Sequence, residues 1–189
     1  AVQSVAKADG PGKPIADAPI TSHQDKLLTV AFEAAQAIPT DPLIKDQSRQ
    51  TESVVTTCLE LDLPQRAFGY LQGIRNWRRG AALADYVFYC VGNGYRVEAR
   101  KHLEIAERIA EAAQLDWRRD TILLKIARTH AWLGRDDQAR RLGADVEPMH
   151  KGRVIGMLPS ELDQKEYDAR LAALGELVRI GGYDEQKSA

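Results

Sequence analysis

The chain has 189 residues, of which 44% are hydrophobic and 28% are charged, and its 26 Lys and Arg nearly balance its 27 Asp and Glu. This length is enough for about one domain with its own hydrophobic core. The formal net charge of −1 argues against capture of nucleic acid or of an acidic membrane by the charge of the whole molecule. No apolar run approaches the ~18 residues of a membrane span, so we expect a soluble protein.

The first 21 residues contain three prolines and two glycines among small residues, without a sustained apolar period. This composition is typical of a flexible or extended arm. The sequence begins with Ala1 rather than Met, so both a cytoplasmic location and export after signal-peptide cleavage stay open. Two cysteines, Cys58 and Cys90, are too few for a disulfide scaffold and do not decide the compartment.

Helical periodicity begins at Ser22, whose side chain can cap the helix, with Asp25 three residues later as the partner in a capping box. Apolar residues then recur at helical spacing until Pro39 and Pro42 end the helix. Six further helices follow, separated by short turns, and we place them at residues 45–60, 64–74, 77–91, 96–113, 117–133 and 136–143. Apolar and polar residues do not alternate convincingly in any stretch, so the sequence predicts an all-α fold.

The C-terminal part continues this helical pattern after a break. Pro148, Gly152 and Gly156 indicate a loop, and Pro159-Ser160 introduces a last helix that Gly181-Gly182 ends. The resulting organisation is a helical domain (22–146), a loop (147–159), a C-terminal capping helix (160–182) and a polar tail (183–189).

Four features recur in register with an offset of 40 residues: a tryptophan, a pair of arginines after it, a turn glycine and an alanine of the following helix. They are Trp77, Arg78-Arg79, Gly94 and Ala99 in one copy, and Trp117, Arg118-Arg119, Gly134 and Ala139 in the next. A degenerate earlier copy has Lys45, Asp62 and Ala67 in the places of tryptophan, glycine and alanine. Such self-similarity predicts stacked helical hairpins, in which the alanines lie where two helices approach closely.

These residues resemble the tetratricopeptide-repeat (TPR) superfamily of α-solenoids. The resemblance depends on Leu133-Gly134 ahead of Ala139, on Leu123 and Ala127 in the preceding helix, and on the equivalent Leu83, Gly94 and Ala99. It covers residues 45–146 and implies a right-handed α-α superhelix of about three helical hairpins. The flanking N- and C-terminal helices would then cap the exposed ends of the stack.

The resemblance also implies that the first helix of each hairpin lines a concave groove. The residues expected on that face are Arg49, Glu52 and Thr56, then Asp85, Phe88 and Tyr89, then Lys125, Arg128 and Trp132. A groove with aromatic anchors and a basic end suits an extended acidic segment or a partner helix. The alternative is a helix face that contacts only solvent.

Cys58, Cys90 and His130 occupy one equivalent position in three successive copies. Thiolate and imidazole are zinc ligands, so a metal site is one interpretation. Neighbouring packed helices lie about 8–10 Å apart, whereas zinc–ligand bonds are about 2 Å long and a disulfide needs Cα atoms within about 7 Å. We therefore expect these side chains to pack in the core, without a metal or a disulfide.

The arginine pairs that follow Trp77 and Trp117 allow two interpretations. One is phosphate binding by paired cations near helix N-termini. The other is structural: each tryptophan is buried in a hairpin junction. The arginines then pair with acidic residues of the adjoining copy. We favour this interpretation because structural requirements recur in repeats more readily than ligand contacts do.

The sequence lacks the common nucleotide-binding, protease and hydrolase motifs, so we expect neither catalysis nor a cofactor. The favoured prediction is a non-catalytic scaffold or adaptor that binds a protein or peptide, alone or as a subunit of a larger assembly. A nucleic-acid-associated repeat protein is the alternative, because residues 96–141 carry 11 Lys and Arg against 8 acidic residues. An enzyme with a site assembled from distant residues is a third and weaker possibility.

Overall fold

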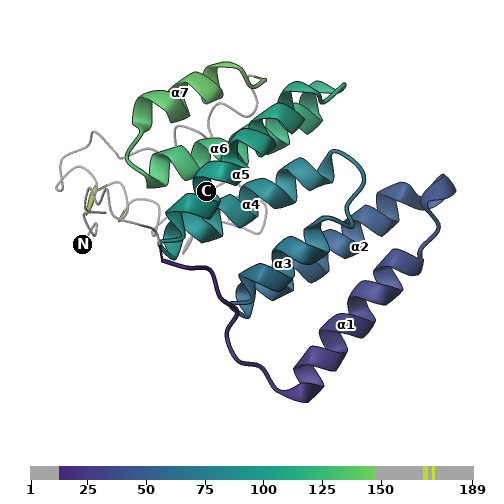
Figure 1. The fold of residues 1–189 in the computed structure, drawn as a ribbon. Coiled ribbons are helices and arrows are strands. Elements are labelled where there is room, and N and C mark those ends of the chain that lie inside the picture. Colours follow the sequence, from purple (N-terminus) through teal and green to yellow (C-terminus); the bar gives the residue numbers. More distant parts are fainter. Residues whose placement is uncertain (1–12, 148–167, 170–171, 173–189) are drawn as a thin grey trace. The chain divides into compact units, whose positions relative to one another are not determined.

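The computed structural model describes residues 13–147, 168–169 and 172. The chain divides into two units, Ala1–Leu158 and Pro159–Ala189, and in the second unit the described residues are helical and exposed. The predicted loop after Glu147, the predicted C-terminal capping helix apart from these residues, and the tail lie outside the described residues. The first unit has seven α-helices within residues 13–147: α1 (Ser22–Ala37), α2 (Thr40–Glu60), α3 (Pro64–Leu71), α4 (Arg78–Gly92), α5 (Arg96–Glu111), α6 (Asp116–Trp132) and α7 (Asp136–Ala144) (Figure 1).

The described part of the chain is all-helical, as the sequence predicts, and its helices pack as hairpins. The hairpins are α2–α3, α4–α5 and α6–α7, and α1 packs on α2. The first helices of the hairpins also pack on one another, α2 on α4 and α4 on α6, so that these three helices form one layer. In Figure 1 the succession runs from α1 at the bottom to α7 at the top.

The start of α1 differs by one residue from the sequence prediction. Thr21, not Ser22, is the N-cap: its hydroxyl accepts a hydrogen bond from the Gln24 amide at 3.2 Å, and the Gln24 side chain accepts one from the Thr21 amide at 3.0 Å. Thr21 has an extended backbone, as N-cap residues do, and this leaves Ser22 in the first turn. Asp25 is therefore not part of the capping box, and it pairs instead with Arg66 of α3.

The three junctions inside the hairpins share one backbone geometry. Asp62, Gly94 and Gly134 have positive φ values of 57°, 80° and 67°. At each junction the amide of the next residue donates to the carbonyl five positions earlier: Leu63 to Cys58 at 2.8 Å, Tyr95 to Cys90 at 2.8 Å and Arg135 to His130 at 2.9 Å. This is the helix-ending pattern that the left-handed conformation allows. The residues that the sequence aligns at the turn position thus occupy equivalent structural positions.

The aligned alanines lie in equivalent positions as well. Ala67, Ala99 and Ala139 are buried on the second helix of each hairpin. The register between the first and second copies is 32 residues and that between the second and third is 40. The difference equals the extra length of α5, which has 16 residues where α3 has 8.

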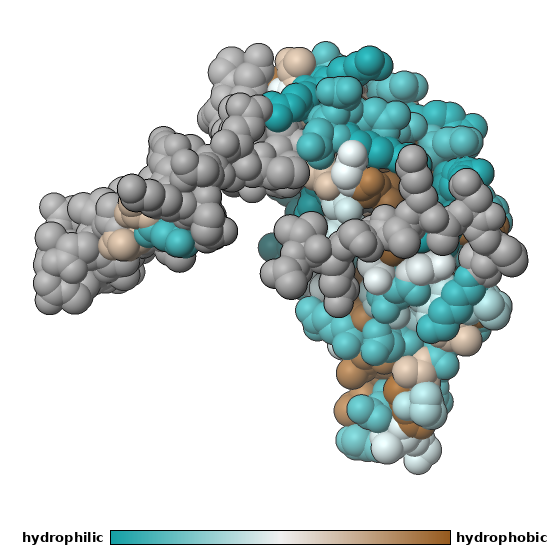
Figure 2. Space-filling view, turned by 90° about the vertical axis from the view of Figure 1, so that its left-hand side faces the viewer, coloured by the Kyte–Doolittle hydropathy of each residue, from teal (hydrophilic) through white to brown (hydrophobic). Residues whose placement is uncertain are grey.

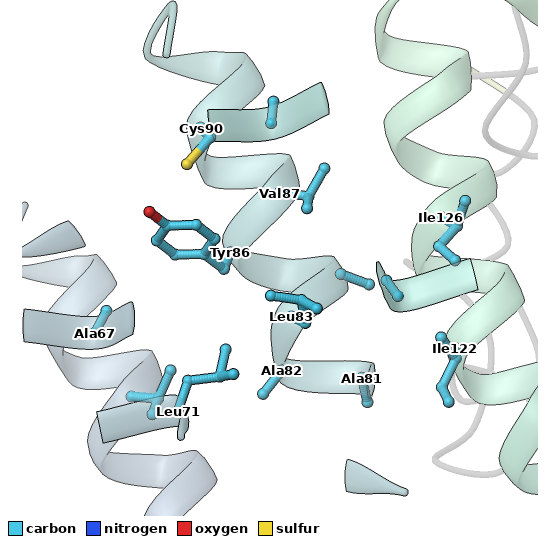
Figure 3. Packing of buried hydrophobic residues seen from close by; sticks show 14 of the residues in the cluster. Ala67, Leu71, Ala81, Ala82, Leu83, Tyr86, Val87, Cys90, Ile122 and Ile126 are labelled. Atoms are coloured by element: carbon cyan, nitrogen blue, oxygen red, sulfur yellow. The ribbon is translucent and has the colours of Figure 1, made fainter. Parts of the chain in front are cut away.

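The hydrophobic core runs continuously along the stack. Figure 3 shows its central part, in which α4 contributes Leu83 and Tyr86 between Leu71 of α3 and Ile122 and Ile126 of α6. All five side chains are buried. Each helix of this part is therefore packed on two sides, as expected when one hairpin supplies the apolar wall of the next.

Close packing around α4 depends on one glycine. A Cβ atom at Gly80 would lie 2.7 Å from Cγ2 of Ile109 and 2.8 Å from Cδ1 of Ile122. These distances are too short for carbon atoms in contact. Gly80 therefore lets α4 approach α5 and α6 more closely than any other residue would.

Residues 13–21 of the expected N-terminal arm lie along the helical domain in an extended conformation, and residues 1–12 lie outside the described residues. The Asp17 carboxylate accepts hydrogen bonds from the amides of Gln65 and Arg66, at 2.6 and 3.2 Å. These amides belong to the first turn of α3, where backbone donors lack a helical partner. Asp17 thus caps α3 from a distant part of the sequence.

Candidate partner-binding surface

Five of the residues predicted for the groove come together across α4 and α6. We name them the α4–α6 cluster: Asp85 and Phe88 of α4, and Lys125, Arg128 and Trp132 of α6. Because α4 and α6 are the first helices of successive hairpins and pack on each other, one partner segment could contact all five side chains.

The charged members of the α4–α6 cluster are already paired. Lys125 Nζ and Arg128 Nη2 contact the two carboxylate oxygens of Asp85, Arg128 at 2.9 Å. All three side chains are partly exposed, between 27% and 38%, so each pair stabilises the fold by at most about 1 kcal/mol. Two cations share one carboxylate, and the cluster therefore keeps one net positive charge.

The aromatic members extend the cluster to the surface. The Arg128 guanidinium lies 4.0 Å from the centroid of the Phe88 ring, which is a close cation–π contact. Phe88 also meets Trp132 edge to face, with ring centroids 5.8 Å apart and an angle of 71°. Trp132 nevertheless stays 55% exposed. The result is an indole held in place by its neighbours with much of its surface open to a partner.

The other four predicted groove residues are not part of this cluster and have other partners. The Thr56 hydroxyl donates to the Glu52 carbonyl one turn earlier, at 3.1 Å. Glu52 of α2 pairs with Arg78 at 2.5 Å, and Arg49 pairs with Asp46 of its own helix at 3.1 Å. The Tyr89 hydroxyl donates to Asp62 at 3.0 Å, and burial together with this carboxylate raises the pKa of Tyr89 above its usual value.

The recurring tryptophans contact each other. The rings of Trp77 and Trp117 meet edge to face, with centroids 4.9 Å apart and an angle of 80°. Arg78 lies over Trp77 and pairs with Glu52 of the preceding hairpin, as the structural interpretation expects. That interpretation also expected both indoles to be buried, but Trp117 is 46% exposed and Trp77 is only partly buried. Arg119 also differs from it, because it pairs with Asp116 and Asp120 of its own helix.

Cys58, Cys90 and His130 are all buried, and both thiols are free. Burial raises the pKa of Cys58 to about 11 and that of Cys90 to about 12. Burial, with a contribution from Arg135, lowers the pKa of His130. Within the described ranges, no three or more His, Cys, Asp and Glu side chains are grouped to hold a metal ion. The core position of the three side chains is the one that the packing interpretation expects.

Sequence reasoning missed a groove between α1 and α2. It has a volume of about 320 Å³ and uncharged walls: Leu28, Ala31, Ala34 and Ala35 of α1 with its C-cap Ile38, and Gln50, Ser53, Val54 and Thr57 of α2. Figure 2 shows hydrophobic residues gathered at the lower end of the molecule, the end at which α1 lies in Figure 1. The signal in the sequence is that apolar residues cover half of the circumference of α1, more than contact with α2 requires.

The comparisons with known proteins give no match: no family model, no curated protein and no solved structure matches this chain. Among the helices that the structure describes, none is both long enough and apolar enough to cross a lipid bilayer.

Proposed function

We propose that the chain is a non-catalytic interaction scaffold or adaptor that binds a protein or peptide segment across the layer of α2, α4 and α6. The observation that supports this proposal is the exposed indole of Trp132, oriented by Phe88 and placed beside Arg128. Trp and Arg are the residue types that most often dominate the free energy of protein association.

The arrangement of the cluster supports binding because its side chains are ordered before a partner arrives. Arg128 is fixed on one side by Asp85 and on the other by the Phe88 ring. A partner that contacts Arg128 and Trp132 would therefore lose little free energy to the ordering of these side chains. A simple solvated face would not need an indole at this position.

The charge of the cluster indicates the partner's chemistry. One positive charge remains after Asp85 is counted against Lys125 and Arg128. We infer a segment that places a carboxylate near these cations and an apolar side chain against Trp132. An extended strand or a helix crossing α4 and α6 would satisfy both contacts.

We also propose that the hairpins form an α-solenoid of the TPR type. Three junctions with the same backbone geometry, at Asp62, Gly94 and Gly134, support this arrangement. The packing of α2 on α4 and of α4 on α6 supports it too. In such a stack the first helices form one continuous surface, on which the α4–α6 cluster would be the best-defined binding site.

Affinity capture from the native source tests the proposed function. The wild-type chain should retain a partner, and the Trp132→Ala and Arg128→Glu variants should reduce the retained amount by at least about tenfold, since truncation of such anchors costs about 2 kcal/mol or more. Val97→Ala is the control, because Val97 is an apolar residue of α5 that is 65% exposed. Circular dichroism checks that all variants keep their helices.

Two results would contradict the proposal. In the first, Trp132→Ala and Arg128→Glu retain the same proteins as the wild type. In the second, the chain retains nucleic acid rather than protein, and higher salt removes it.

A further inference from the structure

The α1 helix carries apolar residues that no other described element covers. Leu28 and Ala35 face α2 and are buried. Leu27 and Val30, on the outer edge, are 55% and 51% exposed. Ala31 lies between the two edges and is also exposed. α1 thus has one apolar edge packed on its own hairpin and a second apolar edge open to solvent.

The open edge adjoins the groove between α1 and α2. All nine residues that line this groove are uncharged. Five of them come from α1 and its C-cap, are aliphatic, and follow the three- and four-residue spacing of one helix face. A helix would fit along such a groove with its apolar side chains inward. The charge pattern beside the groove indicates which helix.

Lys26 and Glu33 are the charged side chains that border the open edge of α1. They lie seven residues apart, two helical turns, and so on the same side of the helix. Neither forms an ion pair within the part of the chain that the structure describes. Asp25, the remaining acidic residue of α1, is paired with Arg66. The edge therefore offers one unpaired cation and one unpaired anion on either side of Leu27 and Val30.

We propose that this edge binds the same edge of a second copy of the chain, with the two α1 helices antiparallel. A two-fold axis beside Leu28 and Thr29 then places Leu27 opposite Val30 of the second copy, and Lys26 opposite Glu33 of the second copy. Each contact occurs twice, as symmetry requires. The dimer buries four aliphatic side chains at its centre and closes two ion pairs at its rim.

Self-complementarity is the reason to choose a second copy over another partner. The charged pair and the apolar pair have nearly the same centre along α1. The midpoint of Lys26 and Glu33 lies one residue, about 1.5 Å, from the midpoint of Leu27 and Val30. One two-fold axis can therefore satisfy the apolar and the charged contacts together. A parallel arrangement would place like charges side by side instead.

The oligomeric state of the full chain, measured by sedimentation, tests this proposal. The wild type should sediment as a dimer at high concentration, and Leu27→Glu/Val30→Glu should be a monomer with unchanged helicity. Val97→Glu introduces a charge at an exposed apolar residue of α5 and should leave the dimer intact. Trp132→Ala should also leave it intact, which separates this proposal from the proposed function. A monomeric wild type, or a dimer that survives Leu27→Glu/Val30→Glu, would overturn the proposal.

Charge reversal tests the antiparallel register. Lys26→Glu and Glu33→Lys should each weaken the dimer by about tenfold or more, since both ion pairs become repulsive. A mixture of the two variants should form a heterodimer of nearly wild-type affinity, because one of its ion pairs is the native pair and the other has its two charges exchanged. The proposal fails if neither variant weakens the dimer, or if mixing does not restore it. It also fails if the wild type is a monomer whose α1 edge is covered by the C-terminal part of its own chain.

Discussion

Asp62 shows how a single backbone angle links the sequence to the arrangement of the helices. It adopts a φ of 57°, in the region that Gly94 and Gly134 occupy at the equivalent turns. Asp is among the few residues with a side chain that tolerate this region. Its carboxylate also accepts the hydrogen bond of Tyr89, so this junction gains a side-chain contact that a glycine could not provide.

Gly94→Ala should reduce the free energy of unfolding by about 1 kcal/mol, because its φ of 80° strains any residue that has a Cβ atom. No atom lies within 4 Å of the Cβ position, so the backbone alone causes the loss. Gly92→Ala is the matched control: its Cβ would also meet open space, but Gly92 is the last residue of α4 and its φ is not positive. It should be neutral or slightly stabilising in chemical denaturation. Equal losses in both variants would contradict the prediction.

Two buried histidines make stability depend on pH. Burial lowers the pKa of His102, which contacts the rings of Phe68 and Tyr86, and burial likewise lowers the pKa of His130. The unfolded chain therefore binds more protons than the folded chain once the pH falls below about 6.5. The stabilising contribution is complete above that pH and is lost as the pH falls toward the lowered pKa values.

Denaturation of the wild type at a series of pH values from about 8 to about 5.5 should thus show a free energy of unfolding that decreases as the pH decreases. The free energy of unfolding of the double variant His102→Gln/His130→Gln should decrease less steeply over the same range. Glu107, whose pKa is raised by burial, acts in the opposite sense, and it is present in both proteins, so the comparison isolates the two histidines. A wild type whose stability is constant over this range would contradict the assigned pKa directions.

At the scale of the helices, the sequence predicts where each element lies but not how elements touch. Periodicity and turn residues place all seven helices of residues 22–144 within a few positions, and the register of glycines and alanines places the three junctions. The start of α2 shows the limit: Asp41 and Leu43 have non-helical angles, and the regular helix begins close to the predicted Lys45. Helix ends depend on a few local hydrogen bonds, which sequence patterns describe only approximately.

Contacts between elements explain why only part of the candidate site could be predicted. The resemblance brings Asp85, Phe88, Lys125, Arg128 and Trp132 to one face, but a helical pattern does not reveal that Asp85 pairs with both cations. The 40-residue register itself marks some of these contacts. Asp85 and Lys125 are equivalent positions and form an ion pair, and Trp77 and Trp117 are equivalent positions in ring contact.

These contacts add to the argument from helix spacing that the sequence allows. That spacing predicts only that Cys58 and Cys90 lie too far apart for a disulfide or a shared metal ion. Long side chains span the distance between α4 and α6, whereas Cys58 and Cys90 are short and remain free thiols in the core. The register thus predicts contacts for long side chains in the layer of first helices.

The packing of α4 between its neighbours leads to a prediction about element spacing. Gly80→Ala should lower the free energy of unfolding by about 1–3 kcal/mol, since its Cβ would overlap Ile109 and Ile122 and force helices apart. Gly69→Ala in α3 is the control, because nothing lies within 4 Å of its Cβ position. There alanine should stabilise the helix, by up to about 1 kcal/mol. A Gly80→Ala variant as stable as the wild type in urea denaturation would show that the close approach is not required.

At the scale of the whole molecule, near-neutral charge and average composition conceal two distinct exposed surfaces. One is the α4–α6 cluster, with an open indole and one net positive charge. The other is the outer edge of α1, with Leu27 and Val30 between a lysine and a glutamate that have no ion-pair partner among the described residues. Their separation on different helices allows a chain that pairs with itself at one surface and holds a partner at the other.

Site-specific photo-cross-linking tests the central claim most directly. A photoreactive phenylalanine derivative replaces Trp132 in one sample and Val97 in another, and both are irradiated in extract from the native source. The account predicts a discrete protein adduct from position 132 that is absent from position 97 and is lost when Arg128→Glu is added. No adduct from position 132, or the same adducts from both positions, would contradict the claim that the α4–α6 cluster binds a partner.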